Sequence, residues 1–138
     1  MAYVSSPKER QKIKNDVLSV ISPNTSPIKC GREMYRCGKN VIHARYCSPG
    51  DGKYKFNINP NTLRADYELW ICGSATNWYL IPIELIKFMY NHSDAYIDRH
   101  HPEIRVVGVD PDHHQAAYAK PSIKIDIEPY LCLMLKDG

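Results

Sequence analysis

Two cationic side chains stand two residues apart in the alternating segment Val41-Ile42-His43-Ala44-Arg45-Tyr46. Because successive side chains of a strand point to opposite faces, His43 and Arg45 would share one face. An arginine can bind phosphate through two parallel hydrogen bonds, but it stays protonated and cannot accept a proton. The pair therefore predicts a phosphate-facing strand, unless both residues are ordinary solvent-facing positions.

Several cations stand beside tyrosines, an interleaving that suits nucleic acid, where cations meet phosphates and rings stack on bases. The candidates for DNA binding are Arg36, Arg45, Lys53 and Lys55, of which Arg45, Lys53 and Lys55 are expected to face one phosphate-binding surface across neighbouring strands. Strands also favour tyrosine in the absence of any ligand, so an ordinary sheet would have the same pattern. The formal net charge is only +3, so a basic surface would have to come from local clustering.

Acidic candidates occur in two places. Glu9 stands three residues after Ser6, where it fits a capping box and also a metal-binding glutamate on a helix. Asp66 and Glu68 alternate along a predicted strand, as a paired-carboxylate site would, yet a solvated strand face has the same pattern.

Two further groups have the side chains of a metal site. The tract Asp110-Pro111-Asp112-His113-His114 could bind a hard metal or a phosphate, which makes His113 a metal candidate beside Glu9; a polar loop is the plainer interpretation. The set Cys30, Cys37, His43 and Cys47 has ligand types suited to Zn²⁺ but lacks a C-x-x-C spacing.

The elements that would position these residues follow from the periodicity of the sequence. A helix should begin at Ser6-Pro7 and should carry Ile13, Val17, Leu18 and Ile21 inward. A hairpin over 33–47, strands over 53–58, 65–72 and 78–83, and a helix over 83–90 are predicted next. Strands over 104–109 and 122–127 follow, the second with Ile123, Ile125 and Ile127 buried, and a short helix could start within 129–135.

The strand over 65–72 has an apolar and a polar face. Its residues Tyr67, Leu69 and Ile71 are expected to be buried with Leu80 and with a helix face of Ile83, Ile86 and either Phe88 or Met89. Asp66, Glu68 and Trp70 would then point the other way. A slip of one residue would bury two unpaired carboxylates, so the apolar face should fix the register.

The stretch Ala65 to Phe88, ADYELWICGSATNWYLIPIELIKF, resembles the closing half of the PD-(D/E)XK nuclease core of homing endonucleases associated with group I introns. The resemblance implies an α/β fold, a small mixed β-sheet flanked by helices. In that family a helix glutamate and a strand aspartate hold Mg²⁺, and the next strand carries glutamate or glutamine, one spacer and lysine. The matching positions here are Glu9, His43 and Arg45, with Lys29 or Cys30 near the aspartate.

These replacements depart from what cleavage needs, because a lysine would repel Mg²⁺ and an arginine cannot act as a base. The resemblance therefore implies a homo-oligomeric protein that binds double-stranded DNA, with cleavage impaired or lost. One alternative is an active Mg²⁺-dependent endonuclease with a rearranged site. That site would be formed by Glu9, His43 and Arg45, or by the histidine-rich loop that contains His113 and His114. Another is an assembly subunit without DNA binding. Mg²⁺ is expected if the chain is catalytic, and no cofactor otherwise.

Length and composition predict the number of domains, the location of the protein and the state of its cysteines. A chain of 138 residues with 43% hydrophobic and 24% charged residues is typical of one globular domain, here 1–138. The N-terminus has no signal-peptide pattern and no apolar run approaches the ~18 residues that span a bilayer, so a soluble, cytoplasmic protein without membrane contact is expected. The five scattered cysteines fit reduced thiols.

Overall fold

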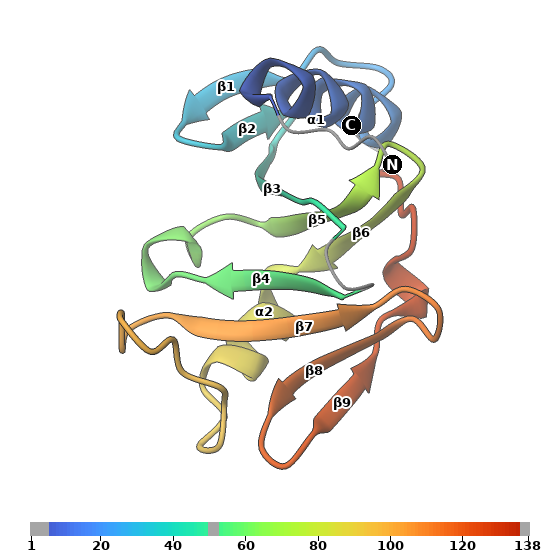
Figure 1. The fold of residues 1–138 in the computed structure, drawn as a ribbon. Coiled ribbons are helices and arrows are strands. Elements are labelled where there is room, and N and C mark those ends of the chain that lie inside the picture. The colour runs from blue at the N-terminus through green and yellow to red at the C-terminus, as the bar shows by residue number, and fades with distance from the viewer. Residues whose placement is uncertain (1–5, 50–52, 136–138) are drawn as a thin grey trace.

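The computed structural model describes residues 6–49 and 53–135, which form two α-helices and nine strands (Figure 1). The helices are α1 (Pro7–Ile21) and α2 (Ile83–Tyr90). The strands are β1 (Ile28–Gly31), β2 (Met34–Cys37), β3 (Asn40–Cys47), β4 (Tyr54–Ile58), β5 (Tyr67–Ser74), β6 (Asn77–Pro82), β7 (Arg105–Asp110), β8 (Gln115–Ala119) and β9 (Ile123–Asp126). Short 3-10 turns cover Pro60–Thr62 and Glu128–Tyr130.

The strands form two sheets. The first sheet has the order β1-β2-β3-β5-β6 and is mixed, because β3 and β5 run parallel while the other neighbours are antiparallel. The second sheet has the order β4-β7-β8-β9 and is antiparallel throughout. The chain leaves the first sheet after β3, adds β4 to the second sheet, and returns for β5 and β6.

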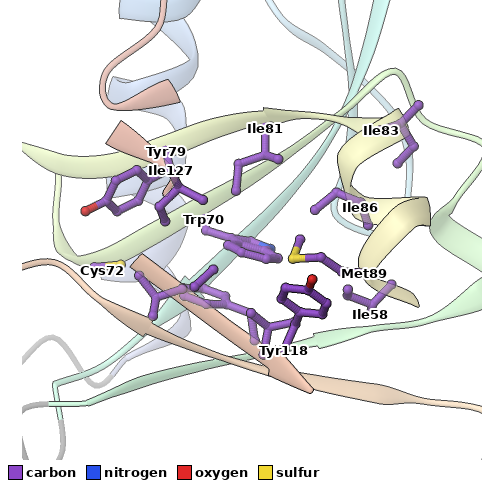
Figure 2. Packing of buried hydrophobic residues seen from close by; sticks show 14 of the residues in the cluster. Ile58, Trp70, Cys72, Tyr79, Ile81, Ile83, Ile86, Met89, Tyr118 and Ile127 are labelled. Carbon is purple, nitrogen blue, oxygen red and sulfur yellow. The ribbon is translucent and has the colours of Figure 1, made fainter. Parts of the chain in front are cut away.

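The strands β5 and β6 of the first sheet are buried on both faces, whereas the edge strand β1 is largely exposed. Helix α1 covers one face, where Val17, Leu18 and Ile21 pack on Ile42 and Leu69. The second sheet and α2 cover the other face, as the layering in Figure 1 shows. Figure 2 shows the core on that side, with Trp70 surrounded by side chains from both sheets and from α2. Two separate cores therefore flank one sheet.

Most predicted elements are present. The first helix begins as expected, because Ser6 is its N-cap: Ser6 Oγ accepts from the Glu9 amide at 3.1 Å and donates to Glu9 Oε1 at 2.9 Å. Ile13 is only half-buried. The hairpin β2-β3, strands β4 to β7, β9 and helix α2 lie close to their predicted ranges. Strands β1 and β8 are additional to the prediction, and the C-terminal segment forms only a 3-10 turn at Glu128–Tyr130.

The α/β class is confirmed, but the arrangement differs from one sheet flanked by helices. A second sheet covers the face of the first sheet that lies opposite α1, while α2 contributes Ile83, Ile86 and Met89 to the core between the sheets. Of the predicted apolar row on β9, Ile127 is buried whereas Ile123 and Ile125 are half-buried. The chain is mostly strand, because β-strands outnumber helices in the described ranges.

Of the predicted partners of the β5 apolar face, Leu80 is confirmed and the α2 residues are wrong. Leu69 and Ile71 do pack with Leu80, but against α1, whereas the α2 residues pack on the opposite face with Trp70. Tyr67 is half-buried. The reason is that both faces of β5 are covered, so the face of Glu68 and Trp70 is also buried. Asp66 remains exposed and accepts a 2.7 Å hydrogen bond from the Val41 amide.

Candidate functional site

Strand β3 places His43 and Arg45 on one face, as the two-residue spacing predicts. This face points away from α1, because the alternate residues Ile42 and Ala44 pack in the α1 core. Across the sheet, His43 lies between Met34 of β2 and Glu68 of β5. The register therefore brings a histidine and a carboxylate side by side on the face that the second sheet partly covers.

His43 and Glu68 form a buried pair. The Nδ1 atom of His43 lies 2.8 Å from Oε2 of Glu68, and the two residues are 3% and 0% exposed. The other oxygen of Glu68, Oε1, accepts from Nε1 of Trp70 at 3.2 Å. The Thr62 hydroxyl lies 3.5 Å from Oε2, at the outer limit of a hydrogen bond. A buried carboxylate needs such partners because removal from water is costly. Glu68 is thus compensated, which corrects the expectation of a solvated strand face.

A pocket of about 370 Å³ is lined by His43 of this pair. Its polar lining comes from the β1–β2 turn, from β3 and from the connection between β4 and β5. These residues are Arg32, Glu33, His43, Arg45, Asn59, Asn61, Thr62 and Arg64. Three arginines and a histidine at one opening make a site suited to an anion.

A second pocket of about 300 Å³ adjoins the first through a shared arginine. Arg64 and Met34 line both, and Arg36 of β2 lines the second. Arg36 lies on the same sheet face as Met34, two residues along the strand. We call Arg32, Arg36, Arg45 and Arg64 the arginine surface. It extends along the part of the first sheet that holds β2 and β3.

Glu33 connects α1 to this surface. One of its oxygens lies 2.6 Å from Lys14 Nζ, and the other lies 3.6 Å from Arg45 Nε. Burial alone would raise the pKa of the Glu33 carboxyl. The hydrogen bond from Lys14 and the nearby charges of Lys14, Arg45 and His43 act in the opposite direction, and the net result is a lowered pKa. Glu33 is therefore held as a carboxylate that orients Arg45.

Glu9 does not join His43 and Arg45. It lies exposed in the first turn of α1, where its carboxylate is engaged by Ser6. Helix α1 packs through Val17 and Leu18 on the sheet face opposite to His43. The expected constellation of Glu9, His43 and Arg45 is thus not assembled, because the apolar side of the helix faces the other core.

Lys53 and Lys55 lie apart from the arginine surface. They line a pocket of about 620 Å³ with Tyr96, Arg99 and Gly108 among others, and no residue of the described ranges lines both this pocket and the one at His43. Strand β4 buries Phe56 and Ile58, so its alternate residues face outward from the second sheet. The expectation that Arg45, Lys53 and Lys55 share one surface is wrong for this reason.

The proposed metal ligands are dispersed. His113 pairs with Asp110 at 2.8 Å in the exposed β7–β8 turn, and His114 Nδ1 bonds the Tyr79 hydroxyl at 2.8 Å. Cys37 packs in the α1 core, on the face opposite to His43, so the Zn²⁺ set is divided by the sheet. Within residues 6–49 and 53–135 no three His, Cys, Asp or Glu side chains are grouped to hold a metal ion.

Sequence reasoning misses Glu33, Arg32 and Arg64 and the role of Glu68. For Glu68 a signal exists, because Trp70 shares its face and a tryptophan in a strand indicates a covered face. For the other three no local pattern points to the site, since a turn and a loop bring them to β3.

Comparison of the chain with protein-family models, with curated proteins and with solved structures finds no match. Neither helix in the described ranges has the length and apolar character needed to cross a bilayer.

Proposed function

We propose that this chain binds nucleic acid through the arginine surface, with duplex DNA as the partner and without Mg²⁺-dependent cleavage. One observation carries the proposal: Arg32, Arg45 and Arg64 converge on a pocket that also contains His43. The resemblance of the stretch Ala65 to Phe88 to homing endonucleases gives the proposal its partner. A homo-oligomer, as such enzymes tend to form, is part of the same proposal.

The chemistry of the surface favours a phosphodiester ligand. A guanidinium can donate two parallel hydrogen bonds to phosphate oxygens, and the amides of Asn59 and Asn61 can donate beside it. Because the net charge of the chain is only +3, the local clustering of arginines decides where an anion is attracted.

Mg²⁺ would find few free ligands here. It prefers oxygen donors, usually carboxylates. Glu33 already pairs with Lys14 and Arg45, and Glu68 pairs with His43 and Trp70. Binding without metal-dependent cleavage follows from this donor set, and it disfavours the alternative of an active Mg²⁺ endonuclease.

Binding of a labelled DNA duplex across a range of salt concentrations tests the proposal. Arg45→Ala and Arg64→Ala should each weaken binding and reduce the log-log salt slope by about one unit for each phosphate that the variant no longer neutralises. Lys12→Ala is the matched control, because Lys12 lies exposed on α1 in an ion pair with Asp16.

Unchanged slopes in both arginine variants would remove the arginine surface from consideration. Slopes that change only in Lys53→Ala and Lys55→Ala would move DNA binding to the outer face of β4. Absence of binding by the parent protein would favour an assembly subunit. Plasmid nicking that requires Mg²⁺ would contradict the part of the proposal that the chain does not cleave DNA with Mg²⁺.

A further inference from the structure

The two imidazole nitrogens of His43 differ in their hydrogen bonds to the described residues. Nδ1 faces Glu68 at 2.8 Å. Among the described residues no group hydrogen-bonds Nε2, and no buried side-chain nitrogen or oxygen in those ranges lacks a partner. Nε2 is therefore not enclosed by protein. His43 lines the pocket at the arginine surface, so this pocket is where a bound ligand would meet Nε2.

Glu68 sets which nitrogen can accept a proton. A carboxylate accepts a hydrogen bond, so the neutral imidazole carries its hydrogen on Nδ1 and its lone pair on Nε2. Trp70 holds the carboxylate in turn through Oε1, which keeps the ring orientation fixed. The result is a proton acceptor on a residue that is 3% exposed and that lines a pocket together with three arginines.

We propose that His43 is a general base that takes the proton of a ribose 2′-hydroxyl, so that the pocket cleaves a phosphodiester on the 3′ side of a ribonucleotide. Glu68 is its positioning residue. The proposal rests on the proposed function, because the arginine surface must first bind the polynucleotide backbone.

The step balances without a metal ion. Nε2 of His43 takes the 2′-hydroxyl proton while the 2′-oxygen forms a bond to the adjacent phosphorus. The bond from phosphorus to the 5′-oxygen of the next nucleotide breaks, and that oxygen takes a proton from water. The hydroxide so formed takes the proton back from the imidazolium. The products are a 2′,3′-cyclic phosphate and a 5′-hydroxyl, and no oxidation occurs.

The residues at hand favour a ribonucleotide because such a substrate supplies its own nucleophile. A base and nearby guanidinium charges suffice for attack by an internal hydroxyl, since Arg45 and Arg64 can stabilise the charge that develops on phosphate. DNA has no 2′-hydroxyl. It would be bound at the same surface and left intact, which agrees with the proposed function.

Two labelled oligonucleotides of identical sequence test the inference, one all-deoxyribose and one with a single ribonucleotide, both in the presence of EDTA. The parent protein should bind both and cleave only the second, at the ribonucleotide, leaving a cyclic phosphate. In His43→Asn the amide can still donate to Glu68 but no base faces the pocket. This variant should fold, bind both oligonucleotides and cleave at least ~100-fold more slowly.

Glu68→Gln should lower kcat with KM little changed, because it disturbs the orientation of His43 and not the arginine surface. His101→Asn, in an exposed histidine next to Glu103, is the control that should cleave like the parent. Absence of cleavage by a parent protein that binds both oligonucleotides would overturn the inference and leave the proposed function standing, as would full activity in His43→Asn. Absence of binding to either would contradict the proposed function itself.

Discussion

Trp70 donates its indole N–H to Oε1 of Glu68 over 3.2 Å, from two residues further along the same face of β5. The Trp70 ring also stacks on Phe56 of the second sheet, with ring centroids 5.1 Å apart and an interplanar angle of 8°. Figure 2 shows Trp70 at the centre of the core between the sheets. The same side chain therefore joins the two sheets and orients the carboxylate that holds His43.

The two phenylalanines of the chain allow a matched test of this core. Phe56→Ala removes the ring that stacks on Trp70, and truncation of a buried phenylalanine costs about 3–5 kcal/mol of unfolding free energy. Phe88→Ala alters a residue that is 55% exposed, so it should cost about 0.5 kcal/mol or less. Urea unfolding measures both. Equal losses in the two variants would contradict the packing of Phe56 between the sheets.

The buried pair should be costly to break. His43→Ala removes the hydrogen bond of His43 to Glu68 and leaves the Glu68 carboxylate uncompensated in a site that is 0% exposed, so a loss of about 3–5 kcal/mol of unfolding free energy is expected. His113→Ala breaks a pair of the same 2.8 Å length, but in an exposed turn, where such pairs contribute about 1 kcal/mol or less. Comparable losses of unfolding free energy in both variants would show that burial does not determine how much such a pair contributes to stability.

Local signals in the sequence predict most of the elements but not the site. The capping box at Ser6 and Glu9 predicts the start of α1, and the alternation around His43 and Arg45 predicts a shared face. The burial of Glu68 depends on the second sheet. That sheet needs β8, whose sequence QAAYA gives little strand signal, and for this reason the sequence alone predicts a solvated Glu68.

The position of the lysines depends on topology in the same way. A surface shared by Lys53, Lys55 and Arg45 requires consecutive strands to be neighbours in one sheet. Strand β4 instead pairs with β7, at a sequence separation of about fifty residues. No pattern within β4 itself indicates which sheet it joins, so this part of the site could not be predicted from the sequence.

Acid should weaken the contact between α1 and the arginine surface. The pKa of Glu33 is lowered below its ordinary value of 4.5, so the unfolded chain binds more protons than the folded one in that range. The contribution of Glu33 to stability is therefore present above pH 4.5 and is lost as the pH falls through the folded pKa. Glu33→Gln should lower the melting temperature at neutral pH and progressively less in acid.

Asp16→Asn is the control for Glu33, because Asp16 forms an exposed ion pair with Lys12. Its effect on melting should be small at every pH, since exposed pairs contribute little. The melting temperatures of Glu33→Gln and of the parent protein could instead differ by the same amount from neutral pH into acid. That result would mean that the ion pair with Lys14 does not lower the pKa of Glu33.

High pH should lower the stability of the protein, because each of the two cores contains a buried thiol. Burial raises the pKa of Cys72 to about 12 and that of Cys37 to about 11, both from an ordinary value of 9.0, with Cys47 and Cys30 as minor causes. Between the ordinary and the raised value the unfolded chain binds fewer protons than the folded one, so stability falls as the pH rises.

The contribution of these thiols to the unfolding free energy should therefore be constant up to pH 9.0 and decline above it, and the unfolding free energy of Cys72→Ala should decline less steeply there than that of the parent. The reactivity of the thiols tests the same burial. The thiolate is the nucleophile, so a buried thiol with a raised pKa reacts slowly. At neutral pH a disulfide reagent should modify the exposed Cys30 and Cys132 quickly, and Cys37 and Cys72 only after denaturant is added. Rapid modification of all five cysteines in the folded protein would contradict the burial of Cys72 between the sheets and of Cys37 beneath α1.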